Sequence, residues 1–110
     1  MGYALGVKAA EALSDPTRRR IVELLAEGEA SAGELAAQFS TSRPAVSRHL
    51  RVLREQGLVA VRSEAQRRLY SLDPTPLAEL DAWLGRYRSF WAQRLDALDT
   101  QLVRSRKEKA

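Results

Sequence analysis

The fold is decided by residues 40–57, which read Ser40-Thr41-Ser42-Arg43-Pro44-Ala45-Val46-Ser47-Arg48-His49-Leu50-Arg51-Val52-Leu53-Arg54-Glu55-Gln56-Gly57. Val46, Leu50 and Leu53 recur at helical spacing and form one apolar stripe. Most polar side chains fall on the opposite side of the predicted helix: Arg43, Ser47, Arg48, Arg51 and Arg54. The stretch therefore predicts an amphipathic helix that buries one face and presents arginines on the other.

Both ends of this helix are marked in the sequence. Ser42 can cap its start, and Pro44 lies in the first turn, where a missing N–H costs least. Gly57 stands where a left-handed residue commonly ends a helix. A helix with outward arginines, a serine and the small Ala45 suits the major groove of double-stranded DNA.

Residues 31–57 predict a helix-turn-helix. Ser31 and Glu34 have the spacing of a capping box, which opens a helix over residues 32–39 and is followed by a three-residue turn. Earlier helices are predicted over residues 3–13 and from Asp15, a candidate N-cap, to about residue 27. The arginines at residues 18–20 sit at the wrong end of that second helix for its dipole. We favour a structural role for them over contact with a DNA phosphate.

A change of period after Gly57 predicts a β-hairpin over residues 58–72. Residues 58–62 and 68–72 are β-prone, and residues 63–67 form a charged loop between them. A hairpin directly after a DNA-reading helix is a wing. Its side chains can reach a minor groove or phosphates, and the candidates are Arg62, Gln66, Arg67 and Arg68. A merely solvated hairpin is the alternative, which the adjoining basic helix disfavours.

The last predicted helix runs over residues 76–103, which at 1.5 Å per residue is roughly 40 Å. Its apolar side chains are too many for one small core to cover, so a second copy of the chain is expected to pack on them. With Leu5 of the first helix, the candidate dimer-interface residues are Leu77, Leu80, Leu84, Tyr87, Trp91, Leu95 and Leu98. A ligand pocket lined by Trp83, Tyr87, Phe90 and Trp91 is a less favoured alternative.

The composition is consistent with one DNA-binding domain of 110 residues. Residues 43–68 carry a net charge of +5 within a chain of net charge +4, so the positive charge is concentrated in about a quarter of the chain. Concentrated arginine points to a polyanionic partner. The sequence has no cysteine and no run long enough to span a membrane. A cytoplasmic protein is expected.

Taken together, the motifs resemble an ArsR-type winged-helix transcriptional regulator. The matching segments are Ala12-Leu13-Ser14-Asp15-Pro16-Thr17-Arg18, Gly33-Glu34-Leu35-Ala36, Pro44-Ala45-Val46-Ser47-Arg48-His49-Leu50-Arg51-Val52-Leu53 and Gly57-Leu58-Val59. The resemblance implies a mainly α fold with a small β-hairpin (α+β): four helices, two strands and a long final helix. It also implies a homodimer, joined by helices 3–13 and 76–103, that binds a palindromic operator and usually represses transcription.

By motif position, the resemblance assigns base reading to Arg43, Pro44, Ser47 and Arg48. Ser42 and Arg51 complete the set of recognition-helix residues expected to touch DNA, beside the wing candidates named above. Metal-sensing relatives carry cysteines at the positions of Ser31 and Gly33, or Asp and His ligands on the last helix. This chain has neither set, so no metal or other cofactor is expected, and whether a small molecule acts as an effector is open.

Two other classes of function fit the sequence less well than DNA binding. A winged helix that binds only proteins is the alternative, but it would not need a basic recognition face. An enzyme is remote, because the chain has a single histidine, His49, no cysteine and no converging pair of carboxylates. His49 is expected to pack or to touch the DNA backbone.

Overall fold

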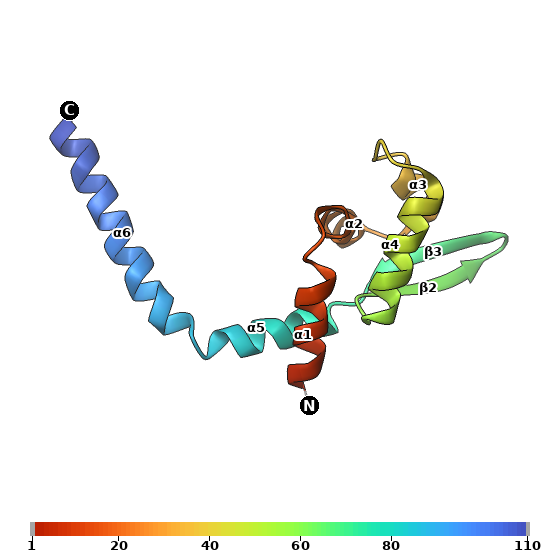
Figure 1. Ribbon diagram of the computed structural model, residues 1–110, viewed down its shortest axis with the longest axis horizontal. Coiled ribbons are helices and arrows are strands. Elements are labelled where there is room, and N and C mark those ends of the chain that lie inside the picture. The colour runs from red at the N-terminus through yellow and green to blue at the C-terminus, as the bar shows by residue number, and fades with distance from the viewer. Residues whose placement is uncertain (1, 110) are drawn as a thin grey trace. The chain divides into compact units, whose positions relative to one another are not determined.

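The computed structural model describes the backbone of residues 2–109 and the side chains of residues 6–104. Residues up to Leu80 form one compact unit, and those from Asp81 onward form a second, whereas the sequence suggested one domain over 1–110. In chain order the elements are α1 (Gly2–Ala12), α2 (Pro16–Glu27), β1 (Ala30–Ser31), α3 (Ala32–Ala36), α4 (Arg43–Glu55), β2 (Val59–Glu64), β3 (Arg67–Leu72), α5 (Thr75–Gly85) and α6 (Arg88–Lys109) (Figure 1). The predicted winged helix-turn-helix, mainly α with a small β-hairpin, is confirmed.

The core of the first unit is built on the buried stripe of α4. Val46, Leu50 and Leu53 are at most 1% exposed, as their spacing predicted. They form one cluster with buried side chains of α1, α2, α3 and the hairpin, which include Ala9, Ala12, Ile21, Leu25, Leu35, Leu58 and Tyr70. Because α4 buries one complete face here, its opposite face is held outward.

The sheet has three antiparallel strands in the order β1-β3-β2. The predicted hairpin is present as β2 and β3, which run side by side and project past α4 (Figure 1). Strand β1 was not predicted, because two residues are too few to show a period. It forms by pairing Ala30 with Tyr70 and Ser31 with Leu69, and so joins the start of α3 to the wing.

The predicted helix caps are confirmed. The side chains of Asp15, Ser31 and Ser42 accept hydrogen bonds from backbone N–H groups at the starts of α2, α3 and α4. Gly57, with φ +79°, takes the left-handed conformation expected after α4. The predicted helix over 32–39 is too long, because α3 ends at Ala36 and continues only as hydrogen-bonded turns.

The wing strands are longer, and their loop shorter, than predicted. Strands Val59–Glu64 and Arg67–Leu72 leave only Ala65 and Gln66 between them, in place of a five-residue loop. Ala65 has φ +55°, a region that favours glycine. The register continues to the Glu64–Arg67 pair, which brings both of these charged residues into the ladder.

Helices α1 and α2 are fastened by side chains that the sequence left without partners. Arg18 Nε donates to the carbonyl oxygen of Ala12 at 2.6 Å, and Arg19 Nη1 donates to that of Leu13 at 2.8 Å. Cations near the C-terminus of α1 offset its dipole and satisfy its last carbonyls. Arg18 and Arg19 thus have a structural role at the junction of α1 and α2, while the preference for such a role over contact with a DNA phosphate stays a prediction.

The prediction of one helix over 76–103 is wrong, because the helix is interrupted. Helix α5 ends at Gly85, a turn follows in which Arg86 N bonds Trp83 O at 3.2 Å, and α6 begins at Arg88. Glycine lowers helix stability at such a point, and the apolar spacing, which continues across the turn, gave no sign of it. In the part of the chain that the structure describes, no helix is long and apolar enough to cross a membrane.

Candidate nucleic-acid interface

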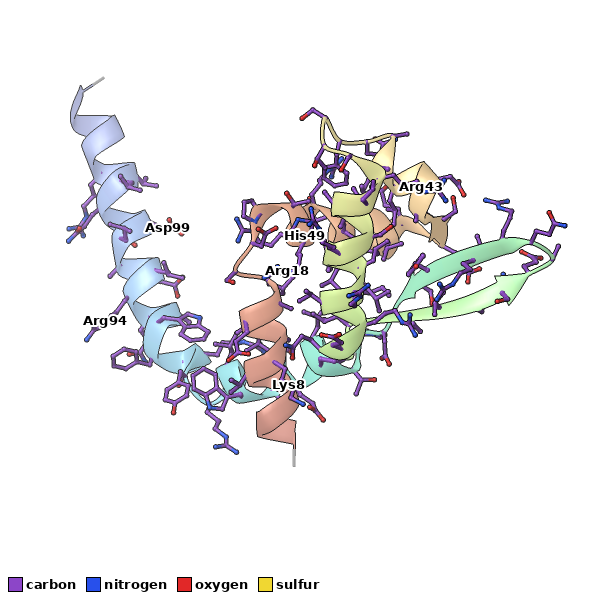
Figure 2. The ribbon with its side chains drawn as sticks, turned by 45° about the vertical axis from the view of Figure 1, so that its right-hand side comes forward. Lys8, Arg18, Arg43, His49, Arg94 and Asp99 are labelled. Carbon is purple, nitrogen blue, oxygen red and sulfur yellow. The ribbon has the colours of Figure 1, made fainter. Side chains whose placement is uncertain are left out.

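The outward face of α4 is lined by unpaired cations. Pro44, Ser47, Arg48 and Arg51 are all exposed, and Arg43 is exposed at the end of α4 nearest α3 (Figure 2). The side chains of Arg43, Arg48, Arg51 and Arg54 make no hydrogen bond or ion pair with any residue described in the structure. Their guanidinium groups are therefore available to an external anion.

Two neighbouring clefts separate α4 from the wing. The first, about 470 Å³, is lined by Ser31, Ala32, Gly33, Arg43, Ser47, Gln66, Arg67, Arg68 and Tyr70. The second, about 250 Å³, is lined by Ser47, Arg51, Arg54, Arg68 and Tyr70. Arginine is the only charged residue type in either lining. The two clefts share Ser47, Arg68 and Tyr70 and thus form one positively charged surface along the side of α4 that faces the wing.

The four wing candidates separate into two groups. Gln66, Arg67 and Arg68 line the clefts beside α4, whereas Arg62 lines neither of them. Arg62 instead donates to both carboxylate oxygens of Glu29, at 2.8 and 2.9 Å, and lies 3.6 Å from Glu64. The pairing with Glu29 fastens β2 to the segment between α2 and β1.

Arg67 is also paired, although it lines the first cleft. Its Nη2 donates to Glu34 Oε1, which also accepts the backbone N–H of Ser31 in the capping box at 3.2 Å. One carboxylate therefore serves both the start of α3 and the wing. Arg68, in contrast, has no hydrogen-bonding or charged partner among the described residues.

Hydrogen bonds to these carboxylates lower their pKa values. The side-chain hydrogen bond from Arg62 lowers the pKa of Glu29. The backbone N–H of Ser31, with Arg67 beside it, lowers the pKa of Glu34. Both groups are consequently more acidic in the folded chain than in the unfolded chain.

We expect thermal stability to fall in acid as these carboxylates are protonated. Because the pKa values of Glu29 and Glu34 are lowered in the folded chain, the two carboxylates stabilise the fold fully above the ordinary glutamate pKa, about 4.5. This stabilisation is lost as the pH falls below that value through the folded pKa values. Circular-dichroism melts at a series of pH values test this, and a Glu29→Gln/Glu34→Gln double variant should lose less stability over the same range. An identical acid dependence in the variant would contradict the assignment.

The single histidine joins α4 to the start of α2. His49 Nδ1 lies 3.8 Å from Asp15 Oδ2, and the His49 side chain is 27% exposed (Figure 2). Asp15 also caps α2 by accepting the backbone N–H of Arg18 at 2.9 Å, which is the main cause of its lowered pKa. His49 therefore packs within the protein as expected, beside the carboxylate of Asp15, which caps α2.

The candidate dimer residues differ in how far the chain itself covers them. Leu77 and Leu80 pack against the core of the first unit. Leu84 and Trp91 are partly exposed, whereas Tyr87, Leu95 and Leu98 are 46–54% exposed. The side chain of Leu5 lies outside the residues that the structure describes. The apolar surface that remains open is therefore concentrated on α6, where Phe90, Leu102 and Val103 add to it.

The aromatic residues of the second unit make local pairs. The rings of Trp83 and Tyr87 pack with centroids 5.2 Å apart, and Arg94 lies over the ring of Phe90 at 4.5 Å. A ligand pocket among these rings and Trp91 stays a prediction. Among the side chains described in the structure, no three of the His, Cys, Asp and Glu type gather where they could hold a metal ion.

Glu29 and Glu34 are the residues of this surface that sequence reasoning missed as partners of the wing. Each lies 33 residues from the arginine that it binds, so no local pattern links them. The pairing of β1 with β3 helps to bring the two segments together. Glu34 carried a visible capping signal, but that signal explained only one of its two contacts.

Comparison with known proteins gives a consistent result. The family model described as bacterial regulatory protein, arsR family, matches residues 15–61. The HTH-type transcriptional regulator Rv2034 of Mycobacterium tuberculosis is 51% identical over 80% of this chain and 79% of its own length. The transcriptional repressor SdpR of Bacillus subtilis is 38% identical over 67% of this chain and 82% of its own length. The structure of an ArsR-like transcriptional regulator from Rhodococcus sp. RHA1 is 32% identical, with a TM-score of 0.71, over 89% of this chain and 92% of that one.

Proposed function

Because the chain belongs to the ArsR family of bacterial regulatory proteins, we propose that it acts as a homodimeric, sequence-specific DNA-binding repressor in the cytoplasm. The observation that carries the proposal is the row of unpaired arginines on the exposed face of α4, bordered by the cationic clefts. Such a face matches the groove and the phosphates of duplex DNA. The relatives named above as transcriptional regulator and repressor support the same function.

Within the proposed interface, position suggests a division of roles. Arg48 is exposed on α4 and lines neither cleft, so it is assigned to base edges. Arg43, Pro44 and Ser47 are exposed on the first turns of the same helix and are assigned to base edges with it. Arg51, Gln66, Arg67 and Arg68 line the clefts between α4 and the wing and are assigned to phosphates. Ser42, which precedes α4, is assigned to a phosphate as well. Arg62 is removed from the contact set, since its guanidinium is already occupied by Glu29.

A dimer is proposed because α6 exposes apolar side chains that the other residues of the second unit leave uncovered. Two copies related by a twofold axis would present two α4 helices to half-sites about one helical turn apart on a palindromic operator. The proposed interface consists of Leu5, Leu77, Leu80, Leu84, Tyr87, Trp91, Leu95 and Leu98. No metal sensor is included in the proposal.

Binding to fragments of genomic DNA tests the proposal directly. We expect the full chain to retain a small set of fragments at moderate salt, which share a palindromic sequence that then serves as the operator. Failure to bind either these fragments or random duplex at low salt would favour the protein-binding alternative. The identity of the selected fragments would also point to the regulated gene.

We expect Arg48→Ala and Arg68→Ala to weaken DNA binding in different ways. Arg48→Ala should reduce operator affinity by about 1–3 kcal/mol, with much less effect on random duplex, because it removes base reading. Arg68→Ala should weaken both duplexes alike and reduce the salt slope by about 1. Fluorescence anisotropy at several salt concentrations measures both effects.

The matched control is Arg20→Ala, which removes the same charge from α2, outside both clefts. It should change operator affinity less than either of the other substitutions. Equal losses on both duplexes for Arg48→Ala and Arg68→Ala would contradict the division of roles.

A further inference from the structure

The first cleft contains three arginines that do not have equal freedom to bind an anion. Arg43 and Arg68 have no protein partner among the described residues, whereas Arg67 is bound to Glu34. Glu34 does not line the cleft but follows directly after Gly33, which does. The Glu34 carboxylate, at the rim of the cationic cleft, is therefore bound to the guanidinium of Arg67, the third arginine.

The position of Glu34 is fixed by contacts that do not depend on Arg67. Its Oε1 accepts the Ser31 backbone N–H, and its own backbone N–H donates to Ser31 Oγ at 3.1 Å. The pairing of Ser31 with Leu69 then sets α3 beside β3, two residues from Arg67. The capping box therefore fixes the Glu34 carboxylate beside the start of β3, where Arg67 lies.

We propose that Glu34 competes with a DNA phosphate for Arg67 and thereby sets the affinity of the protein for DNA in general. This inference rests on the proposed function. When DNA enters the cleft, Arg67 leaves the Glu34 carboxylate and binds a DNA phosphate instead. Glu34 then has no protein cation beside it and attracts one from solution. The exchange cancels the counterion release that a free arginine would contribute. Both the affinity and the salt dependence are lower than three free arginines would produce.

The pairing of Arg62 with Glu29 provides an internal comparison. Both pairs join the wing to the segment before α4, and all four side chains are at least one-third exposed. Only Arg67, however, lines a cleft beside α4. Removing the charge of Glu29 therefore frees an arginine that is not directed at the proposed DNA path.

Glu34→Gln is the decisive substitution, because glutamine also completes a capping box. We expect it to bind operator and random duplex about two- to fivefold more tightly than the natural chain near 0.1 M salt. Its salt slope should be steeper by about one contact. Melting curves at neutral pH should show that the fold is kept.

Three further variants separate the proposed mechanism from a simple change of net charge. Glu29→Gln removes the same charge and should leave affinity and slope nearly unchanged. Arg67→Ala should bind no more tightly than the natural chain, and adding Glu34→Gln to it should produce little further gain. A gain of the same size with Glu29→Gln, or one that persists without Arg67, would overturn the inference, as would an unchanged Glu34→Gln variant. If the natural chain itself binds no duplex at low salt, the proposed function fails instead.

Discussion

Leu98→Glu is expected to turn the proposed dimer into a monomer and to weaken operator binding about 100-fold or more. Leu98 is 51% exposed within one chain and lies in the apolar stripe of α6. A twofold interface contains the substitution twice, so two carboxylates would have to be buried where two leucines packed. Loss of the dimer would remove the advantage of two linked half-site contacts, which is commonly about 10²- to 10⁴-fold.

Sedimentation at micromolar concentration and operator titration measure the two parts of this expectation. Gln93→Glu is the matched control, because it adds the same charge to the same helix on the side away from Trp91 and Leu95. It should leave both properties unchanged. A natural chain that sediments as a compact species of 12.3 kDa, or a Leu98→Glu variant that remains dimeric, would refute the proposed interface.

Leu53→Ala is expected to destabilise the first unit by about 2–5 kcal/mol, the usual range for a large core side chain reduced to alanine. Leu53 is completely buried, and alanine favours helix, so the loss comes from packing rather than from helix propensity. With Val46 and Leu50 it anchors α4 to the core. DNA binding should therefore fail at a lower temperature than in the natural chain.

Urea unfolding followed by circular dichroism gives the change in free energy. Val52→Ala is the control on the same helix, since Val52 is only half-buried and should cost distinctly less. A loss for Leu53→Ala no larger than that for Val52→Ala would mean that α4 is not held by its apolar stripe.

Sequence reasoning was sufficient for α4 because every determinant of that helix is local. The cap at Ser42, the stripe from Val46 to Leu53 and the positive φ of Gly57 all lie within one short segment. The same holds for the capping box at Ser31. These local signals predicted which face of the helix is buried and which is exposed. The arginines proposed to contact DNA were identified as part of the exposed face.

The features that sequence reasoning missed depend on contacts between distant segments. Strand β1 exists only because β3 lies beside it, and its pairing in turn carries Glu34 toward Arg67. The occupied state of Arg62 depends on Glu29 in the same way. Charge counting treated the three wing arginines as equivalent, whereas ion pairing leaves Arg68, among the described residues, as the wing arginine without a charged partner.

The interruption of the last helix was missed for a different reason. An apolar period that runs through Leu84, Tyr87 and Trp91 indicates one continuous helix, and the period is insensitive to a single turn. Gly85 was the available signal, but one glycine is often tolerated inside a helix. The consequence is that the dimer residues expected on this helix are divided between α5, the turn that holds Tyr87, and α6.

Asp15 occupies a junction at which three helices share a few polar atoms. It caps α2 through the N–H of Arg18, the side chain of Arg18 holds the last carbonyls of α1, and the imidazole of α4 lies 3.8 Å away. A tilt of α1 would stretch the bonds to Arg18, whose backbone N–H is bonded to Asp15, and Asp15 in turn lies beside His49 of α4. A movement of α1, caused by subunit association or by the binding of an effector, would thus be transmitted to α4 through Arg18, Asp15 and His49.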